Sequence, residues 1–161
     1  MNKTIIIYHS YTGNTKKIVE QIKNKLKCDE LELEPLTPFS TDYQTVVNEW
    51  QNNSIKDEVA IKPVEIDFSQ YTNIIIGSPI WWYTITPVIS TFLKTNNLED
   101  KNIYPLFTSA GWFGHCVKDF KSLCKSKNIK KELKITFAED YNLHEIVSNK
   151  QDIEKWIEEI K

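Results

Sequence analysis

The stretch that decides the fold reads Thr4-Ile5-Ile6-Ile7-Tyr8-His9, followed directly by Ser10-Tyr11-Thr12-Gly13-Asn14-Thr15. The first half is rich in β-branched apolar side chains, which predicts a short strand buried on both faces, as central parallel strands are. A helical pattern follows at once, and its apolar face, at a period of about 3.6 residues, is made by Ile18, Val19, Ile22 and Leu26. Residues 10–15 therefore form a polar turn between the end of a strand and the start of a helix.

Such a turn is suited to binding an anion. The first N–H groups of a helix have no intrahelical acceptor, and the helix dipole favours negative charge there. Ser10, Thr12 and Thr15 add hydroxyl donors. Asn14 adds an amide, and Gly13 lets the backbone approach a ligand closely. Since the turn contains no Lys or Arg, it would bind through neutral donors, which suits the acceptor oxygens of a terminal phosphate monoester.

Two other phosphate-binding patterns, G-x-x-x-x-G-K-[ST] and G-x-G-x-x-G, are absent. The alternative to an anion site is a polar turn in which a Thr or Asn is an ordinary N-cap. However, Ser10-Tyr11-Thr12-Gly13-Asn14-Thr15 resembles the [ST]-x-T-G-x-T loop of the flavodoxins, which holds the phosphate of FMN in that family. The resemblance implies a noncovalently bound FMN, with further contacts from the loops that follow the third and fourth strands.

The second loop follows the apolar run 73–76, which predicts another strand buried on both faces. Thr86-Pro87 then predicts the N-cap and first position of a helix. Adjacent aromatic rings in a surface loop need a partner, and a flat heterocycle supplies one by stacking. The resemblance implies that the isoalloxazine ring is lined by Ser78, Pro79, Ile80, Trp81, Trp82 and Tyr83. Two questions stay open: whether the Trp pair instead packs beneath a neighbouring loop, and which Trp stacks.

The third loop follows the predicted strand 103–107 and precedes a helix whose inward side chains are Val117, Phe120, Leu123 and Cys124. It matches the third flavodoxin loop, which often begins Thr-Ser-Gly-Gly, although Ala110 replaces one glycine and Trp112-Phe113 make it bulkier. The resemblance implies that it edges the flavin through Ser109, Ala110, Gly111, Trp112, Phe113 and Gly114.

The remaining chain completes a pattern of alternating strands and helices. A half-exposed edge strand is predicted at 30–35, a helix from Asp42 to about Asn53, and a fifth strand at 133–137. The last helix carries an apolar stripe and a capping box, Ser148-x-x-Gln151. This alternation, with the resemblance, predicts one α/β domain over residues 1–161: a flavodoxin-like three-layer sandwich around a five-stranded parallel sheet of order 2-1-3-4-5, with helices on both faces.

Composition narrows the class of protein. The net charge of −2, with every basic residue a Lys, gives no basic stripe for nucleic acid. No apolar run approaches the length of a membrane span, and no signal peptide is evident, so we expect a cytoplasmic protein without a membrane partner. The odd number of cysteines fits reduced thiols. His9 and His115 match no metal-ligand spacing, so no metal site is predicted.

Three functions remain open at the level of the sequence. The resemblance implies electron transfer through bound FMN, to a redox partner protein or a small-molecule acceptor. The alternatives are an FMN-dependent NAD(P)H:quinone-type reductase and a non-enzymatic FMN-binding regulatory module. The three loops contain no Asp or Glu, and negative charge near a flavin makes its last electron more reducing. We therefore expect a less extreme hydroquinone potential than in an acidic flavodoxin. No catalytic residue and no oligomeric state are assigned.

Overall fold

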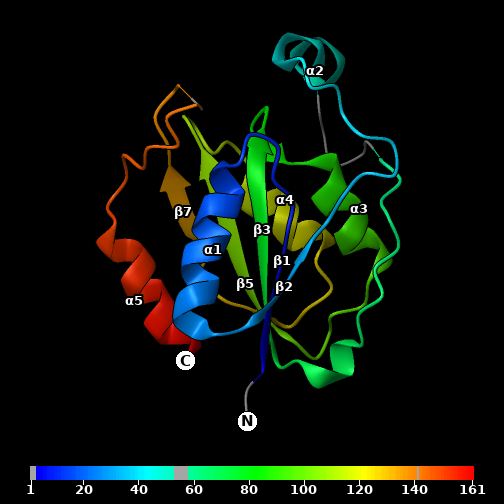
Figure 1. Cartoon of the computed structure of the whole chain (residues 1–161). Helices are drawn as coiled ribbons and strands as arrows, with labels where there is room; N and C mark the ends of the chain where they lie inside the picture. Colours follow the sequence, from blue (N-terminus) through cyan, green and yellow to red (C-terminus); the bar gives the residue numbers. More distant parts are fainter. Residues whose placement is uncertain (1–2, 53–57, 141) are drawn as a thin grey trace.

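The computed structural model describes residues 3–52, 58–140 and 142–161. A central sheet separates two layers of helices (Figure 1). Helices α1 (Asn14–Leu26) and α5 (Gln151–Ile160) cover one face, and α3 (Pro87–Thr95) and α4 (Cys116–Leu123) cover the other. Helix α2 (Tyr43–Trp50) lies beyond the edge at which the central strands end. None of the helices in these ranges has the length and apolar character that crossing a membrane requires.

In the described part of the chain the sheet has seven strands, whereas the sequence analysis predicts five. Their order is β2-β1-β3-β5-β6, with β7 also paired to β5 and β4 antiparallel to β3. The predicted order is confirmed, because β6 and β7 both pair with β5 and together occupy the place of the predicted fifth strand. The bounds are β1 Thr4–Tyr8, β2 Asp29–Glu32, β3 Asn73–Trp81, β4 Thr84–Ile85, β5 Asn102–Ser109, β6 Asn128–Ile129 and β7 Leu133–Thr136, with a 3-10 turn at Phe68–Gln70.

Strand β1 is fixed by two hydrophobic cores at once. Ile6 packs into the core beneath α1 and α5, whereas Ile5 and Ile7 pack into the core beneath α3 and α4. All three side chains are at most 1% exposed. Burying an aliphatic side chain of this size contributes about 1.5–3 kcal/mol, so a shift of one residue in register would exchange the two faces and is strongly disfavoured. The polar turn after Tyr8 is therefore held at the end of the sheet.

Strand β3 is longer than the sequence predicts. Residues 77–81 were expected in a loop, yet Ser78 and Pro79 pair with Phe107 and Thr108 of β5. Ile80 then pairs with Ile85, because the chain folds back to form β4. The pairing partners come from other parts of the chain, so the local sequence does not reveal them. As a result, the second loop is a tight hairpin rather than an open loop.

The predicted capping box of the last helix is wrong. Helix α5 begins at Gln151, and the acceptor for the Gln151 N–H is the side-chain oxygen of Asn149, at 2.9 Å. The Ser148 hydroxyl instead accepts a hydrogen bond from the Thr136 N–H, at 3.0 Å. Thr136 ends β7, which lacks a further strand on that side in the described residues. Ser148 therefore accepts a hydrogen bond from a backbone N–H of the sheet, and the neighbouring Asn149 accepts one from the first N–H of the helix.

Helix α2 begins as predicted. The Asp42 carboxylate accepts hydrogen bonds from the Thr45 N–H at 3.1 Å and the Thr45 hydroxyl at 2.6 Å, and these bonds lower the pKa of Asp42. The helix ends at Trp50, before the predicted end at Asn53, which lies outside the described residues. Its buried side chain, Val46, faces the molecule.

Candidate functional site

The loops after β1, β3 and β5 meet at the edge of the sheet where these strands end (Figure 1). Two buried hydroxyls join the first loop to β5, because Thr15 Oγ1 and Thr108 Oγ1 are 2.8 Å apart. The His9 N–H donates to the Gly77 carbonyl at 3.1 Å, which joins the first loop to β3. All the residues predicted to hold a cofactor are therefore gathered on one side of the fold.

The first loop, residues 10–15, has the geometry of an anion-binding turn. Gly13 occupies the N-cap position of α1 in a left-handed conformation (φ 100°), which other residues rarely adopt. Its carbonyl accepts the Lys17 N–H at 3.0 Å, and Ser10 Oγ accepts the Lys16 N–H at 3.2 Å. The N–H groups of Asn14 and Thr15 begin the helix, so they have no acceptor within it. Thr12 and Asn14 are partly buried on this turn, whereas Thr15 points into the interior.

A hollow of about 350 Å³ lies between the first loop, the β3–β4 hairpin and α2, lined by Tyr11, Tyr43, Val46, Val47, Ile80, Trp81 and Trp82. Tyr11 is held there by its hydroxyl, which donates to the Ser40 carbonyl at 2.5 Å. Its ring contacts the edge of Trp81, with the ring centroids 5.6 Å apart. Helix α2 therefore forms one wall of an apolar recess that begins at the polar turn.

The two Trp side chains of the hairpin have different environments. Trp81 is 8% exposed and packs against Phe39 and His9 with ring centroids 4.9 and 5.8 Å away. Trp81 is therefore a core side chain, which agrees with the alternative in which it packs beneath a neighbouring loop. Trp82 is only partly buried, and Tyr83 is 50% exposed. Both have left-handed backbones, with φ of 47° and 72°, so the turn directs these two rings away from the core.

Ser78 and Pro79 shape the hairpin. Ser78 is fully buried; its hydroxyl donates to the Pro79 carbonyl at 2.8 Å and accepts the Thr86 N–H at 3.1 Å. The Ser78 side chain is thus occupied within the protein. Pro79 and Ile80 are partly buried beside it, and Ile80 lines the recess.

The third loop is tied to the hairpin by its backbone. The His115 N–H donates to the Tyr83 carbonyl at 2.8 Å. This contact requires Gly114, because a Cβ at that position would lie 2.2 Å from the Cβ of Tyr83 and 2.4 Å from its carbonyl oxygen. Gly114 also has a left-handed φ of 59°. The second and third loops therefore behave as one structural unit.

The tip of the third loop is the most exposed part of the candidate site. Ser109 Oγ accepts the Gly111 N–H at 3.1 Å, which shapes the turn around the exposed Ala110. Trp112 is 72% exposed and lies 5.0 Å from the ring of Tyr83. Phe113 instead packs against the core, with the Lys134 ammonium 5.6 Å from its ring centroid. The structure thus exposes one aromatic pair beside the apolar recess.

The fold also brings a carboxylate to this region, although the loops contain none. Asp119 Oδ2 accepts the Thr84 hydroxyl at 2.5 Å and is hydrogen-bonded to Nδ1 of His115. Asp119 lies one turn into α4, and its side chain is 15% exposed. The absence of Asp and Glu is thus a property of the three loop sequences, and the fold adds Asp119 beside them.

His9 has a structural role. It is 3% exposed, and its Nδ1 lies 2.9 Å from the Thr86 hydroxyl. Burial lowers the pKa of His9 to about 3, so the imidazole is neutral at physiological pH. Among the described residues, no three His, Cys, Asp or Glu side chains converge as a metal site would need.

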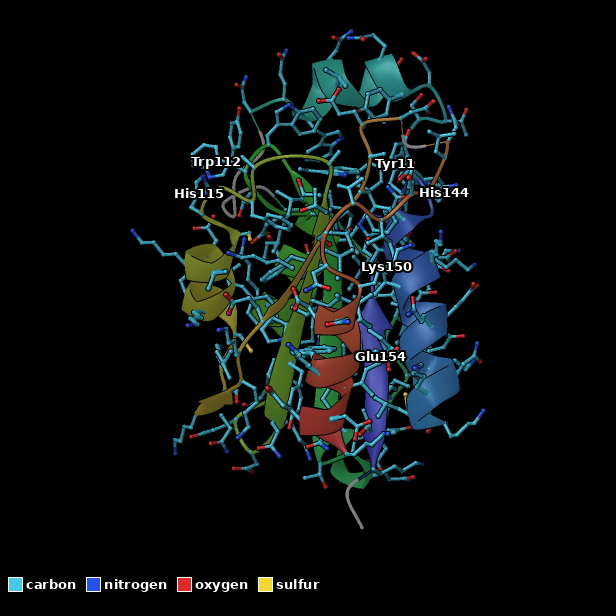
Figure 2. All side chains as sticks on the ribbon, turned by 90° about the vertical axis from the view of Figure 1, so that its left-hand side faces the viewer. Tyr11, Trp112, His115, His144, Lys150 and Glu154 are labelled. Carbon is cyan, nitrogen blue, oxygen red and sulfur yellow. The ribbon has the colours of Figure 1, made fainter. Side chains whose placement is uncertain are left out.

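His144 was missed by the sequence analysis. Its Nδ1 lies 2.6 Å from the Asn14 side-chain oxygen, and its Cε1 lies 3.3 Å from the position of a Cβ on Gly13. Figure 2 shows His144 above α1, and Trp112 and His115 above α4. The available signal was indirect: α1 and α5 cover the same face, so the segment before α5 passes the start of α1.

Comparisons with known proteins agree with this architecture. A family model described as Flavodoxin matches residues 3–160. Among solved structures, a flavoprotein of Lactobacillus acidophilus NCFM in complex with FMN is 27% identical, covering 83% of this chain and 93% of that chain, with a TM-score of 0.65.

Two further solved structures share the fold. A protein of Bacteroides eggerthii DSM 20697 is 23% identical over 99% of this chain and 98% of its own, with a TM-score of 0.75. A flavodoxin from the domain Archaea is 14% identical over 97% and 92%, with a TM-score of 0.53. No curated protein matches the sequence. The match to the family model spans nearly the whole chain and includes all three loops, and the chain therefore belongs to the flavodoxin family.

Proposed function

We propose that the protein binds one FMN noncovalently, with the phosphate in the turn 10–15, and transfers electrons through it. The observation that carries this proposal is the left-handed Gly13 at the start of α1, which leaves the first N–H groups of the helix facing the turn. The similar Lactobacillus acidophilus flavoprotein, solved in complex with FMN, supports the same ligand here.

The donors present fit a phosphate monoester. The turn offers backbone N–H groups, hydroxyls and an amide, all neutral, and a monoester presents three oxygens that each accept hydrogen bonds. FAD and NAD carry a bridged diphosphate and lack this terminal group. The ring system would find apolar surface at Ile80, Trp82, Tyr83 and Trp112, beside the recess closed by α2.

In this proposal the protein supplies binding and orientation, and bound FMN supplies the one- and two-electron chemistry. The turn fixes the phosphate end. The aromatic side chains exclude water from one side of the flat ring, and the bond between His115 and the Tyr83 carbonyl holds the two loops together around it. Asp119, hydrogen-bonded to Thr84 and His115, adds negative charge behind these loops.

Titration calorimetry with FMN and with riboflavin tests the phosphate site. FMN should bind much more tightly than riboflavin, and Thr12→Asp should remove most of that difference through repulsion between two anions. Thr95→Asp is the matched control, because Thr95 is exposed at the far end of α3, and its affinity for FMN should match wild type. Equal affinities of the wild type for FMN and riboflavin would contradict a phosphate site in this turn.

Tryptophan fluorescence tests where the ring lies. FMN should quench the emission, and Trp82→Phe and Trp112→Phe should each reduce the quenched fraction, since these two rings are accessible and belong to the second and third loops. Affinity for FMN that is unchanged after both Trp82→Ala and Trp112→Ala would place the ring elsewhere.

The second candidate function is an FMN-dependent NAD(P)H:quinone-type reductase. The exposed pair of Trp112 and Tyr83 favours it, because a flat acceptor could stack there. Anaerobic reductive titration followed by a turnover assay with NAD(P)H and a quinone separates the two functions. Abundant semiquinone without turnover would identify an electron carrier that serves a redox partner protein. Rapid NAD(P)H oxidation with little semiquinone would identify the reductase.

A further inference from the structure

The segment between β7 and α5 places His144 beside the proposed phosphate turn. Both ring nitrogens of His144 lie 3.9 Å from the position of a Cβ on Gly13, and Cε1 between them lies 3.3 Å away. The ring edge that carries the nitrogens therefore faces the turn. A second contact fixes the segment, because the Lys17 ammonium donates to the His144 carbonyl at 2.6 Å. Figure 2 shows this segment passing over the start of α1.

The hydrogen bonds of His144 define its protonation chemistry. Nδ1 is bonded to the Asn14 side-chain oxygen at 2.6 Å. An amide oxygen only accepts, so Nδ1 carries the proton. In the neutral imidazole, Nε2 is then an acceptor with a lone pair, and within the described residues it has no protein partner. A lone pair next to a phosphate repels it, whereas an N–H there would donate a charge-assisted hydrogen bond. The site thus binds phosphate more strongly when Nε2 is protonated.

We propose that His144 binds the phosphate of the ligand as an imidazolium, so that FMN binding takes up one proton and weakens as the pH rises. This inference rests on the proposed binding of FMN in the turn 10–15. It adds a residue from the far end of the chain to the phosphate site, and it gives this otherwise neutral turn a charge that depends on pH. Histidine is suited to this role because an imidazole changes charge near neutral pH.

The other charges around His144 are few. Lys17 on α1, Glu145 on the same segment and Lys150 at the start of α5 line the adjacent hollow of about 320 Å³. Between pH 7 and 8.5 the phosphate monoester is almost fully dianionic, since its second pKa is about 6. In this range a change in affinity therefore reports on the histidine.

Calorimetry of the protein between pH 7 and 8.5, with FMN and with riboflavin, tests the proposal. The affinity for FMN should fall by up to about tenfold per pH unit as the pH rises, while the affinity for riboflavin, which lacks the phosphate, should stay constant. At pH 7.5, titrations in two buffers of different ionisation enthalpy should show uptake of close to one proton per FMN and none per riboflavin.

Two variants locate the effect. His144→Gln should keep the wild-type affinity for riboflavin but bind FMN several-fold more weakly at pH 7, with no pH dependence and no proton uptake. Lys150→Gln, which removes a charge from the same hollow without touching the turn, should keep the wild-type pH dependence. Wild-type FMN affinity that does not vary with pH, or a pH dependence that persists in His144→Gln, would overturn the role of His144. If neither FMN nor riboflavin binds at any pH, the proposed function itself fails.

Discussion

Gly114→Ala should uncouple the second and third loops. The added Cβ would lie 2.2 Å from the Cβ of Tyr83, 2.4 Å from its carbonyl oxygen and 2.6 Å from its Cα. Two of these atoms belong to the backbone, so a side-chain rotation cannot relieve the clash, and the loop must move away. The movement breaks the 2.8 Å hydrogen bond from the His115 N–H to the Tyr83 carbonyl.

The size of the effect follows from two contributions. A residue other than glycine in the left-handed region costs about 1–2 kcal/mol, and Gly114 has a φ of 59°. Loss of the backbone hydrogen bond costs about 1 kcal/mol. The free energy of unfolding should therefore fall by about 2–3 kcal/mol, which for a chain of this size lowers the melting temperature by about 4–12 °C.

Urea unfolding of the protein without FMN, followed by circular dichroism, measures this change. Gly111→Ala is the matched control, because among the described residues no heavy atom outside its two chain neighbours lies within 4 Å of a Cβ at that position. It should change the free energy of unfolding by less than about 1 kcal/mol in either direction. If Gly114→Ala and Gly111→Ala unfold at the same urea concentration, the close approach of Gly114 to Tyr83 does not hold the loops together.

Three further predictions concern buried groups. The pKa of His9 is lowered to about 3 by burial. Below about pH 6.5 this side chain is therefore protonated in the unfolded chain but stays neutral in the folded protein. Between pH 7 and 5 the wild type should therefore lose roughly 1–2 kcal/mol more unfolding free energy than His9→Gln in urea titrations; equal losses would contradict the burial. Thr15→Val leaves the buried Thr108 hydroxyl without its 2.8 Å partner and should destabilise the protein by about 1–3 kcal/mol, whereas Thr15→Val with Thr108→Val should cost less than the sum of the two single changes. Burial raises the pKa of Cys116 and Cys124 to about 11, so mass spectrometry should detect their alkylation by iodoacetamide at pH 8 only after unfolding; rapid labelling of the native protein would argue against their burial.

Local sequence, together with the resemblance, was sufficient for the main helices and for the order of the parallel strands, but it did not predict β4, β6 or the full length of β3. The isoleucines of β1 alternate between two cores, and this is visible as an unbroken apolar run because both faces are buried. The conformation of the turn 10–15 was also predictable, since it is local: a left-handed Gly13, hydroxyl side chains and a helix start lie within six residues. Hydrophobic periodicity and turn chemistry arise between residues that are close in the sequence, so they can be predicted from the sequence alone.

The environment of each site residue was decided by the tertiary structure. Trp81 and Trp82 are adjacent in sequence, yet Trp81 is covered by Phe39 while Trp82 remains partly open. Strand β3 continues through Pro79 because β5 offers it a pairing edge. These outcomes depend on segments that lie tens of residues away in the sequence. No pattern within the loop encodes which of these segments will pack against it.

The charges at the site show the same division. The sequence determined that residues 10–15, 78–84 and 109–114 carry no acidic or basic side chain. Folding then placed Asp119 behind Thr84, and His144 against Asn14, which precedes it by 130 residues. Because a charge acts through distance in space rather than separation along the chain, the electrostatics of the site exist only once α1, α4 and α5 have packed onto the sheet.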